Sequence, residues 1–194
     1  MEVPSILTSG VLVSDSYLPH TPLSRCIDNF ISIIGRGLVF IWLILLAVIV
    51  VNVISRYVFS QGHIELEELQ WHLYSIGFIF GISYAYQTDA HIRVDILYEN
   101  FSDPIKAWIE LYGTLLFLVP FIILILVFSI QFVSSSWAVG EVSSSPGGLP
   151  FRYLIKAALP TGFLLLLLAV VSRLTRIFQF LFFPSAKGSS DAGK

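Results

Sequence analysis

Four ionisable side chains are crowded into the segment DAHIRVDILY, residues 89–98, which separates two strongly apolar stretches. They are Asp89, His91, Arg93 and Asp95, and they occupy every second position. This alternation is typical of an extended segment with charged groups on one side and apolar groups on the other. The charged groups could pair with a neighbouring chain, or the segment could be an ordinary polar loop between two helices.

A second polar group precedes the next apolar stretch. Glu67 and Glu68 are followed by Trp71, and Arg56 lies at the end of the preceding apolar stretch. Asn52 and Arg56 are four residues apart and would share one face of a helix. The carboxylates could pair with Arg56 or be solvated at a rim. A cation site is disfavoured, because two neighbouring carboxylates supply few of the oxygen ligands that a cation needs.

The sequence does not indicate catalytic chemistry. A membrane haem site needs histidines from different helices at one depth, but His72 and His91 lie at opposite ends of one apolar stretch, and His20 and His63 lie outside the apolar stretches. No nucleophile elbow or phosphate-binding glycine motif is present. The single cysteine, Cys26, excludes an internal disulfide. We therefore expect no enzymatic activity, cofactor or metal.

The composition places the chain in a membrane. Hydrophobic residues make up 56% of the 194 residues, charged residues only 12%, and the mean hydropathy is +0.82. An ordinary globular domain cannot bury so large an apolar fraction. The net charge of -2 and the scattered basic residues also exclude a nucleic-acid-binding protein.

Long apolar segments predict an all-α integral membrane protein with four transmembrane helices, because lipid leaves no partner for unpaired backbone groups. The expected spans are residues 37–58, 67–88, 104–134 and 153–178.

A short amphipathic interfacial helix is expected over residues 22–35, with Thr21 as its N-cap and Pro22 in its first turn. The alternative is a plain extension of the first span. The membrane domain would then cover residues 21–183, between an irregular tail at 1–20 and a flexible tail at 184–194.

The orientation follows from the basic residues. If the N-terminus is cytoplasmic, the inner side holds eight of the 11 lysines and arginines: Arg25, Arg36, Arg93, Lys106, Arg173, Arg176, Lys187 and Lys194. The outer side holds Arg56, Arg152 and Lys156. Because cytoplasmic loops carry the excess of basic residues, both termini are expected in the cytoplasm.

The third span is the longest. Ser102 or Asp103 can cap it before Pro104, and Pro120 is the natural position for a bend or a hinge. Lys106 and Glu110 could pair at its inner edge or be separately solvated. The segment SSSWAVGEVSSSPGGLP, residues 134–150, then predicts an outer loop.

With this orientation the loop lies on the outer side of the membrane, together with Trp137, Glu141 and Arg152. In the second span, Gly77, Gly81 and Ala85 are spaced four apart and form a small-residue stripe that suits a closely packed helix, either within the chain or on a partner.

These motifs together resemble a known family. The segment HIRVD, the pair Glu67 and Glu68 with Trp71, Arg56 with Tyr57, and LPTGF opening the fourth span are similar to the small membrane subunit of tripartite ATP-independent periplasmic (TRAP) transporters, the DctQ-like proteins. The resemblance covers roughly residues 25–180. The N-terminal tail and the long outer loop depart from the simplest members.

The resemblance implies a bacterial or archaeal inner-membrane protein with two partners. One is a large membrane subunit that carries an organic acid or related small solute together with sodium by an elevator movement. The other is a soluble periplasmic protein that captures the solute, and its candidate docking residues in the outer loop are Trp137, Glu141 and Arg152. This chain would be the scaffold for the large subunit. Its candidate interface or anchoring residues are Arg56, Glu67, Glu68, Trp71, Gly77, Gly81, Ala85, His91, Arg93 and Asp95.

Two other functions remain alternatives at this point. A stand-alone channel or transporter would place ionisable groups near the middle of the membrane, whereas here they gather at the ends of the apolar segments. A membrane haem subunit for electron transfer is the less favoured alternative, because the four histidines are not paired across helices at one depth.

Overall fold

This computed structural model describes residues 18–90 and 101–183. All regular secondary structure within these residues is helical. The long helices are α1 (Pro22–Val58), α2 (Ile64–Gln87), α5 (Val119–Ala138) and α6 (Arg152–Phe182). A shorter helix, α4 (Asp103–Gly113), continues through a π-helical turn, η1 (Thr114–Leu118), into α5. For this part of the chain the predicted all-α class is confirmed.

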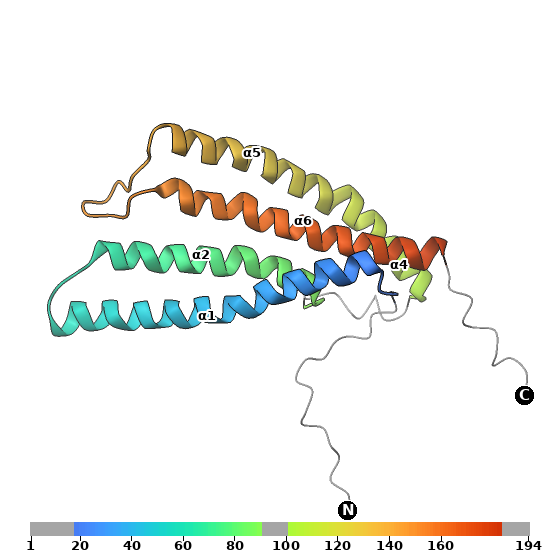
Figure 1. Ribbon diagram of the computed structural model, residues 1–194, viewed down its shortest axis with the longest axis horizontal. Helices are drawn as coiled ribbons and strands as arrows, with labels where there is room; N and C mark the ends of the chain where they lie inside the picture. Colours follow the sequence, from blue (N-terminus) through green and yellow to red (C-terminus); the bar gives the residue numbers. More distant parts are fainter. Residues whose placement is uncertain (1–17, 91–100, 184–194) are drawn as a thin grey trace, which may run out of the picture.

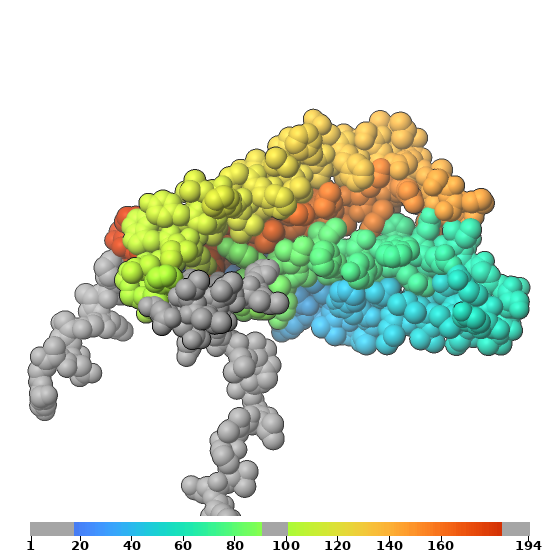
Figure 2. Space-filling view, turned by 180° about the vertical axis from the view of Figure 1, so that it is seen from behind, coloured from blue at the N-terminus to red at the C-terminus, as the bar shows by residue number. Residues whose placement is uncertain are grey.

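The four long helices lie side by side in one row, in the order α5, α6, α2, α1 (Figure 1). We call the end at which α1 begins and α6 ends the terminal end, and the opposite end, with the α1–α2 and α5–α6 connections, the loop end. Helix α6 packs against α5 on one side and α2 on the other, and α1 also contacts α6. The view from behind shows α4 and α5 over one band of the surface and α1 and α2 over another (Figure 2).

The row leaves its edge helices largely uncovered. We compared the most apolar 18-residue stretch of each of the three candidate spans. In α6, 33% of that stretch is buried, compared with 17% in α1 and 11% in the continuous helix Asp103–Ala138, which includes α5. Large apolar side chains are therefore exposed, among them Phe40 at 67%, Phe117 at 76% and Phe128 at 62%. Because burying one such side chain is worth about 1.5–3 kcal/mol, the two edges require lipid or a protein partner as their surroundings.

The most buried apolar contacts are those of α6 with its neighbours. Leu166 and Val170 of α6 pack with Ile122 of α5, and Ile177 packs with Leu111 of α4 nearer the terminal end. Val170, Ile122 and Ile177 are fully buried. The core therefore lies along α6, and it fixes the position of the other helices relative to that helix.

Helix α1 begins as the sequence predicts but is not divided into two helices. Thr21 is the N-cap, its hydroxyl accepts a hydrogen bond from the Ser24 backbone N–H at 2.9 Å, and Pro22 is in the first turn. The separate interfacial helix predicted over 22–35 is instead the first part of one 37-residue helix. The reason is local packing, since Gly35 lies against the ring of Tyr84 and stays helical.

The third predicted span, 104–134, is the continuous helical segment from Asp103 to Ala138. Its N-cap is Ser102, one of the two residues predicted to cap it. The backbone widens into the π-helical turn Thr114–Leu118 immediately before Pro120. Proline has no N–H to bond to the carbonyl four residues earlier, and its ring clashes with that carbonyl. A π-helical turn accommodates the missing hydrogen bond and relieves the clash. The disturbance that the sequence predicted at Pro120 therefore lies one turn before it.

Three described helices, not the predicted four, are long and apolar enough to cross a membrane. They are Pro22–Val58, Asp103–Ala138 and Arg152–Phe182, which correspond to the first, third and fourth predicted spans. Helix α2, predicted as the span 67–88, has 24 residues but does not qualify. Its first turns carry Glu65, Glu67, Glu68, Gln70 and His72, which lower its hydropathy. The count of spans is therefore corrected to three candidates, and α2 returns the chain alongside α1 and α6.

Candidate interface and anchoring sites

Arg173 of α6 is the centre of an ion-pair network at the terminal end. Its Nε donates to the carboxylate of Glu110 in α4, and one of its terminal nitrogens lies 3.2 Å from Oδ2 of Asp89, which follows α2. The Arg173 residue is only 5% exposed. A buried guanidinium needs such partners, because an unpaired buried charge is strongly unfavourable. The network therefore ties α2 and α4 to α6.

The end of α2 brings Asp89 to this network. Asp89 has a φ of 58°, a left-handed conformation that aspartate tolerates better than most residues. The Ala90 N–H donates to the carbonyl of Ala85 at 3.0 Å, and the Asp89 N–H donates to that of Tyr86 at 3.3 Å. These two bonds are the Schellman arrangement that commonly ends a helix. The first residue of the polar segment 89–98 is thus held against α6.

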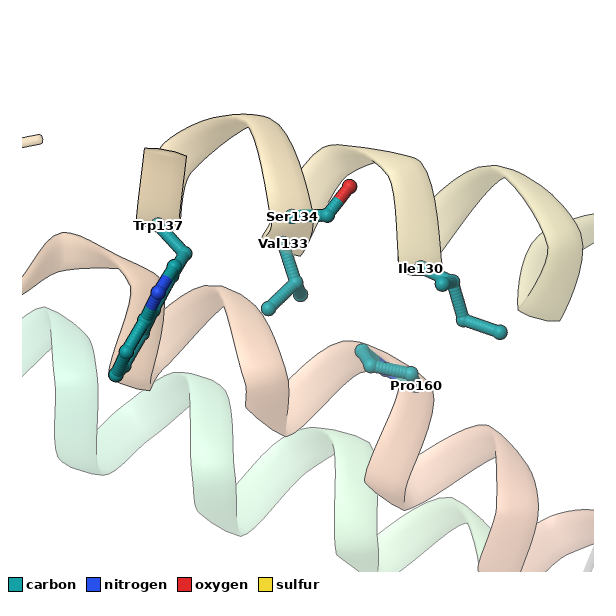
Figure 3. A pocket seen from close by; sticks show the side chains of 5 residues that line it. All are labelled: Ile130, Val133, Ser134, Trp137 and Pro160. Carbon is teal, nitrogen blue, oxygen red and sulfur yellow. The ribbon is translucent and has the colours of Figure 1, made fainter. Parts of the chain in front are cut away.

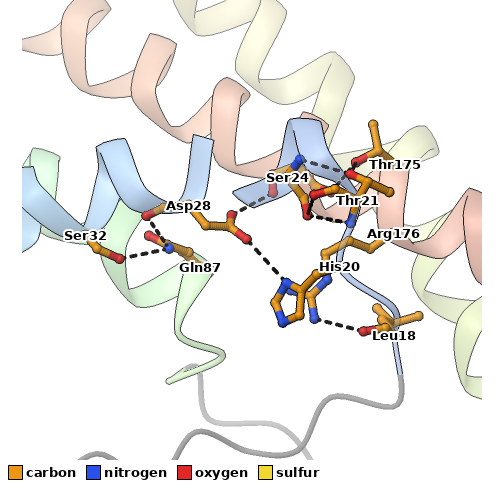
Figure 4. Close-up of polar contacts among 10 residues, drawn as sticks. Leu18, His20, Thr21, Ser24, Asp28, Ser32, Gln87, Thr175 and Arg176 are labelled. Atoms are coloured by element: carbon orange, nitrogen blue, oxygen red, sulfur yellow. Dashed lines mark hydrogen bonds and ion pairs between the residues drawn. The ribbon is translucent and has the colours of Figure 1, made fainter. Parts of the chain in front are cut away.

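A second polar group joins α1 to the same end of α2 and α6 (Figure 4). Ser172 donates from its hydroxyl to Oδ1 of Asp28 at 2.6 Å. The side-chain amide of Gln87 donates to the backbone carbonyl of Asp28 at 2.8 Å and to the Ser32 hydroxyl at 3.1 Å. Helices α1, α2 and α6 are therefore joined by side-chain hydrogen bonds near the terminal end.

The residues just before α1 complete the terminal end. Arg176 donates to the backbone carbonyl of Leu18 at 3.2 Å, and His20 lies 3.9 Å from the Asp28 carboxylate (Figure 4). Burial, together with the positive charge of Arg176, lowers the pKa of His20 below its ordinary value of 6.5. His20 is therefore mainly neutral at pH 7, and its contact with Asp28 is not an ion pair under these conditions.

At the loop end, the neighbouring carboxylates Glu67 and Glu68 have different partners. Glu67 forms an ion pair with Arg56 of α1. Glu68 accepts hydrogen bonds from the Ser143 hydroxyl and, at 2.6 Å, from the Leu149 backbone N–H. Successive helical residues point about 100° apart, so one carboxylate faces α1 and the other faces the α5–α6 connection.

The connection between α5 and α6 is folded against both helices. Glu141 forms an ion pair with Lys156, and the Arg152 backbone N–H donates to the carbonyl of Glu141 at 3.1 Å. Trp137 packs edge-on against Tyr153, with ring centroids 4.5 Å apart. The three predicted docking residues Trp137, Glu141 and Arg152 therefore all make contacts within the chain, although Trp137 is still 65% exposed.

Hydrogen bonds hold two acidic side chains at this connection, Glu68 of α2 and Glu141 of the connection itself, in their charged forms. The Ser143 hydroxyl and the Leu149 N–H lower the pKa of Glu68 below its ordinary value of 4.5. The hydrogen bond from Lys156 is the main cause of the lowered pKa of Glu141. Both side chains favour their ionised forms in the folded protein.

Acid should therefore loosen the α5–α6 connection. Because the folded pKa of Glu68 is below the ordinary value of 4.5, its stabilising contribution is complete above that pH and is lost as the pH falls through the folded pKa. Hydrogen exchange of residues 141–149, corrected for the intrinsic pH dependence of exchange, should rise below pH 4.5. Glu68→Gln should raise this exchange already at neutral pH, whereas the control Glu65→Gln should not. Equal protection in the two variants would contradict this assignment.

An apolar pocket of about 360 Å³ lies between α5 and α6 near the loop end. Trp137 and Val133 point from α5 toward α6, where Pro160 lies opposite (Figure 3). The lining is apolar except for Ser134, so the pocket suits a hydrocarbon group.

Of the two glycines in the predicted small-residue stripe, only Gly77 is closely packed. A Cβ on Gly77 would lie 3.2 Å from the Trp42 ring of α1, whereas a Cβ on Gly81 would meet nothing within 4 Å. Ala85 is half-buried, and Trp71 is 70% exposed. Other close approaches lie outside the stripe, where Gly162 of α6 packs against α2.

The remaining predicted interface residues, His91, Arg93 and Asp95, lie outside the described residues. The pairing of Arg173 with Glu110 and Asp89 was not predicted, since Glu110 was expected to pair with Lys106 or with solvent. Lys106 lies 3.7 Å from Asp103 instead. One signal was available, because the predicted topology places Asp89, Glu110 and Arg173 on the same side of the membrane.

One family model matches the chain. Its description is "Tripartite ATP-independent periplasmic transporters, DctQ component", and the match covers residues 45–180, more than half of the chain. No curated protein matches the sequence.

Proposed function

We propose that this chain, which belongs to the DctQ component family of tripartite ATP-independent periplasmic transporters, holds the large membrane subunit of such a transporter in the bilayer. In this proposal the large subunit moves an organic acid or related small solute with sodium by an elevator movement. The chain lies in the inner membrane of a bacterium or archaeon. Both termini lie in the cytoplasm, because α2 returns the chain alongside α1 and α6, so that α1 begins and α6 ends at the same end of the row. It does not carry the solute itself.

The distribution of charge is the observation that supports a scaffold most strongly. Residues 37–55, 111–138 and 157–172 contain no aspartate, glutamate, lysine or arginine. The buried arginines Arg173 and Arg176 lie near the terminal end and bond within the chain. A solute or ion pathway normally places polar or ionisable groups at mid-membrane depth, and the candidate spans carry no charged residue there.

The arrangement of the helices suits a stationary role. A single row exposes two apolar edges, so one can face the large subunit while the other faces lipid. The polar networks at the terminal end join α1, α2, α4 and α6, which resists sliding of one helix against another. A rigid row attached to the large subunit would enlarge the part of the transporter that stays fixed while another part moves.

The charges at Arg93 and Asp95 are proposed contacts with the large subunit at the cytoplasmic edge. Arg93→Glu and Asp95→Arg, made separately, should each lower the yield of co-purified large subunit by about tenfold, because like charges would then face each other across the interface. The control Arg36→Glu reverses an exposed charge on α1 and should leave the yield unchanged. Normal yields from both test variants would contradict the proposed contact.

The loop end is the proposed docking surface for the periplasmic capture protein. Val139, Val142 and Phe151 are 57–76% exposed there, beside the exposed ring of Trp137. Replacing residues 141–148 with a flexible linker should abolish capture-protein-dependent uptake while the large subunit still co-purifies. The milder variant Val142→Ser should lower uptake without removing the internal bonds of Glu68 and Glu141. Unchanged uptake in both variants would remove this role.

A further inference from the structure

A polar pocket at the loop end lies between the last turns of α1 and the first turns of α2. Its volume is about 400 Å³, and its walls include Asn52, Arg56 and Tyr57 from α1 and Glu67, Gln70 and Trp71 from α2. The contacts proposed above, at Arg93, Asp95 and the α5–α6 connection, do not include this pocket, although Arg56, Glu67 and Trp71 are also among the predicted interface residues. Its lining is also different from that of the apolar pocket between α5 and α6, because polar and apolar groups contribute to it together.

Two buried polar atoms of these pocket residues have no hydrogen-bond partner among the residues that the structure describes. They are Oδ1 of Asn52, which accepts hydrogen bonds, and Nε2 of Gln70, which donates them. Asn52 is only 7% exposed. Because buried polar groups in native proteins are nearly always paired, these two atoms point to a ligand that offers both a donor and an acceptor.

The same pocket presents both signs of charge. Arg56 and Glu67 form an ion pair, and their side chains are 50% and 43% exposed, so an incoming group can reach both. Tyr57 is 79% exposed and Trp71 is 70% exposed. Tyrosine and tryptophan favour the depth of the lipid headgroups, and Asn52 lies near the end of the charge-free stretch of α1. The pocket therefore lies where the membrane meets water.

We propose that this pocket binds the headgroup of an amine-bearing phospholipid of the phosphatidylethanolamine class. The headgroup ammonium donates to Oδ1 of Asn52 and lies near the Glu67 carboxylate. The phosphate oxygens accept hydrogen bonds from Nε2 of Gln70 and from Arg56, as phosphates commonly do from guanidinium groups. The acyl chains extend along the exposed apolar surface of α1.

The donor and acceptor pattern separates this lipid from other common ones. A choline headgroup carries a quaternary nitrogen with no N–H, so it cannot supply the hydrogen bond that Asn52 lacks. A glycerol headgroup supplies hydroxyl donors but no cation to match Glu67. Of the three headgroups, only ethanolamine offers a donor for Oδ1 of Asn52, an acceptor for Nε2 of Gln70, and charges opposite to those of Arg56 and Glu67.

Native mass spectrometry of the full-length protein in detergent tests the proposal with three lipids that share the same acyl chains. Phosphatidylethanolamine should be retained about tenfold more strongly than phosphatidylcholine or phosphatidylglycerol, since it makes additional hydrogen bonds. The double variant Asn52→Leu, Gln70→Leu should lose this preference. Soluble glycerophosphoethanolamine at the same concentration should not displace the lipid, because it lacks the acyl chains.

Gln131→Leu is the matched control, because it removes an exposed glutamine from α5 and should leave the preference intact. If the double variant does not fold, Glu67→Gln serves as a second test, since it changes a half-exposed side chain and should lower the preference for ethanolamine over glycerol severalfold. Equal retention of the three lipids, displacement by the soluble headgroup, or an unchanged preference in the folded double variant or in Glu67→Gln would overturn the assignment.

Discussion

Arg173→Leu is expected to lower the free energy of unfolding by about 3–5 kcal/mol, the usual effect of removing one partner from a buried ion pair. The substitution leaves the carboxylates of Glu110 and Asp89 without the guanidinium that now bonds to both. Their side chains are only 11% and 19% exposed, so water cannot fully replace it. Equilibrium denaturation of the purified protein in detergent micelles measures the change.

Two further variants distinguish the loss of the buried ion pairs of Arg173 from the general effect of removing an arginine. Arg25→Leu removes an exposed arginine from α1 and should change the unfolding free energy by no more than about 0.5 kcal/mol. Combining Arg173→Leu with Glu110→Leu and Asp89→Asn removes the charge of every member of the network and should recover most of the loss. If Arg173→Leu were as mild as Arg25→Leu, Arg173 would not be the link between α2, α4 and α6.

Gly162→Ala should destabilise the protein by about 1–3 kcal/mol, although alanine normally favours helices over glycine. A Cβ at Gly162 would collide with the branched side chain of Ile79 and lie 3.0 Å from the Phe80 ring and 3.3 Å from the Ile79 carbonyl. Helices α2 and α6 would have to move apart, which would also stretch the 3.2 Å hydrogen bond from Ser83 to the Gly162 carbonyl. Thermal and chemical unfolding in detergent measure the loss.

The same substitution at Gly81 is a control with the opposite expected sign. A Cβ at Gly81 would meet nothing within 4 Å, so Gly81→Ala should stabilise the protein by about 0.5–1 kcal/mol through backbone entropy alone. If both alanine variants were stabilised equally, the close approach of α6 to α2 at Gly162 would be wrong.

Local signals in the sequence predicted the helices and their beginnings. Thr21 and Ser102 are N-caps, and prolines follow both of them in the first turn. Such signals act within one helical turn and can be recognised without knowledge of the fold. The charge-free stretches likewise predicted the positions of the apolar helices, although α2 is too polar to count as a candidate span on its own.

Contacts between distant segments could not be predicted in the same way. Arg173 is 63 residues from Glu110 and 84 from Asp89, and the sequence alone indicates only that all three belong at one end of the helices. The glycine spacing showed where a close approach was possible but not which neighbour would use it. Gly77 packs against Trp42, whereas Gly81, one turn later, meets nothing.

The unbroken course of α1 has a similar explanation. The change from amphipathic to fully apolar sequence near Gly37 resembles the boundary between an interfacial helix and a span. Helix α2 packs along α1 across this boundary, with Tyr84 against Gly35 and Gln87 bonded to Asp28. These tertiary contacts stabilise a single continuous helix where composition alone suggested two.

The central claim is that this chain supports solute movement by a partner and has no pathway of its own. Solute uptake into proteoliposomes tests it most directly, with the chain reconstituted alone, the large subunit alone, and both together, each with the capture protein and a sodium gradient. We predict uptake when the two membrane subunits are together and none above empty liposomes for this chain alone. Sodium-dependent uptake by this chain without the large subunit would contradict the claim.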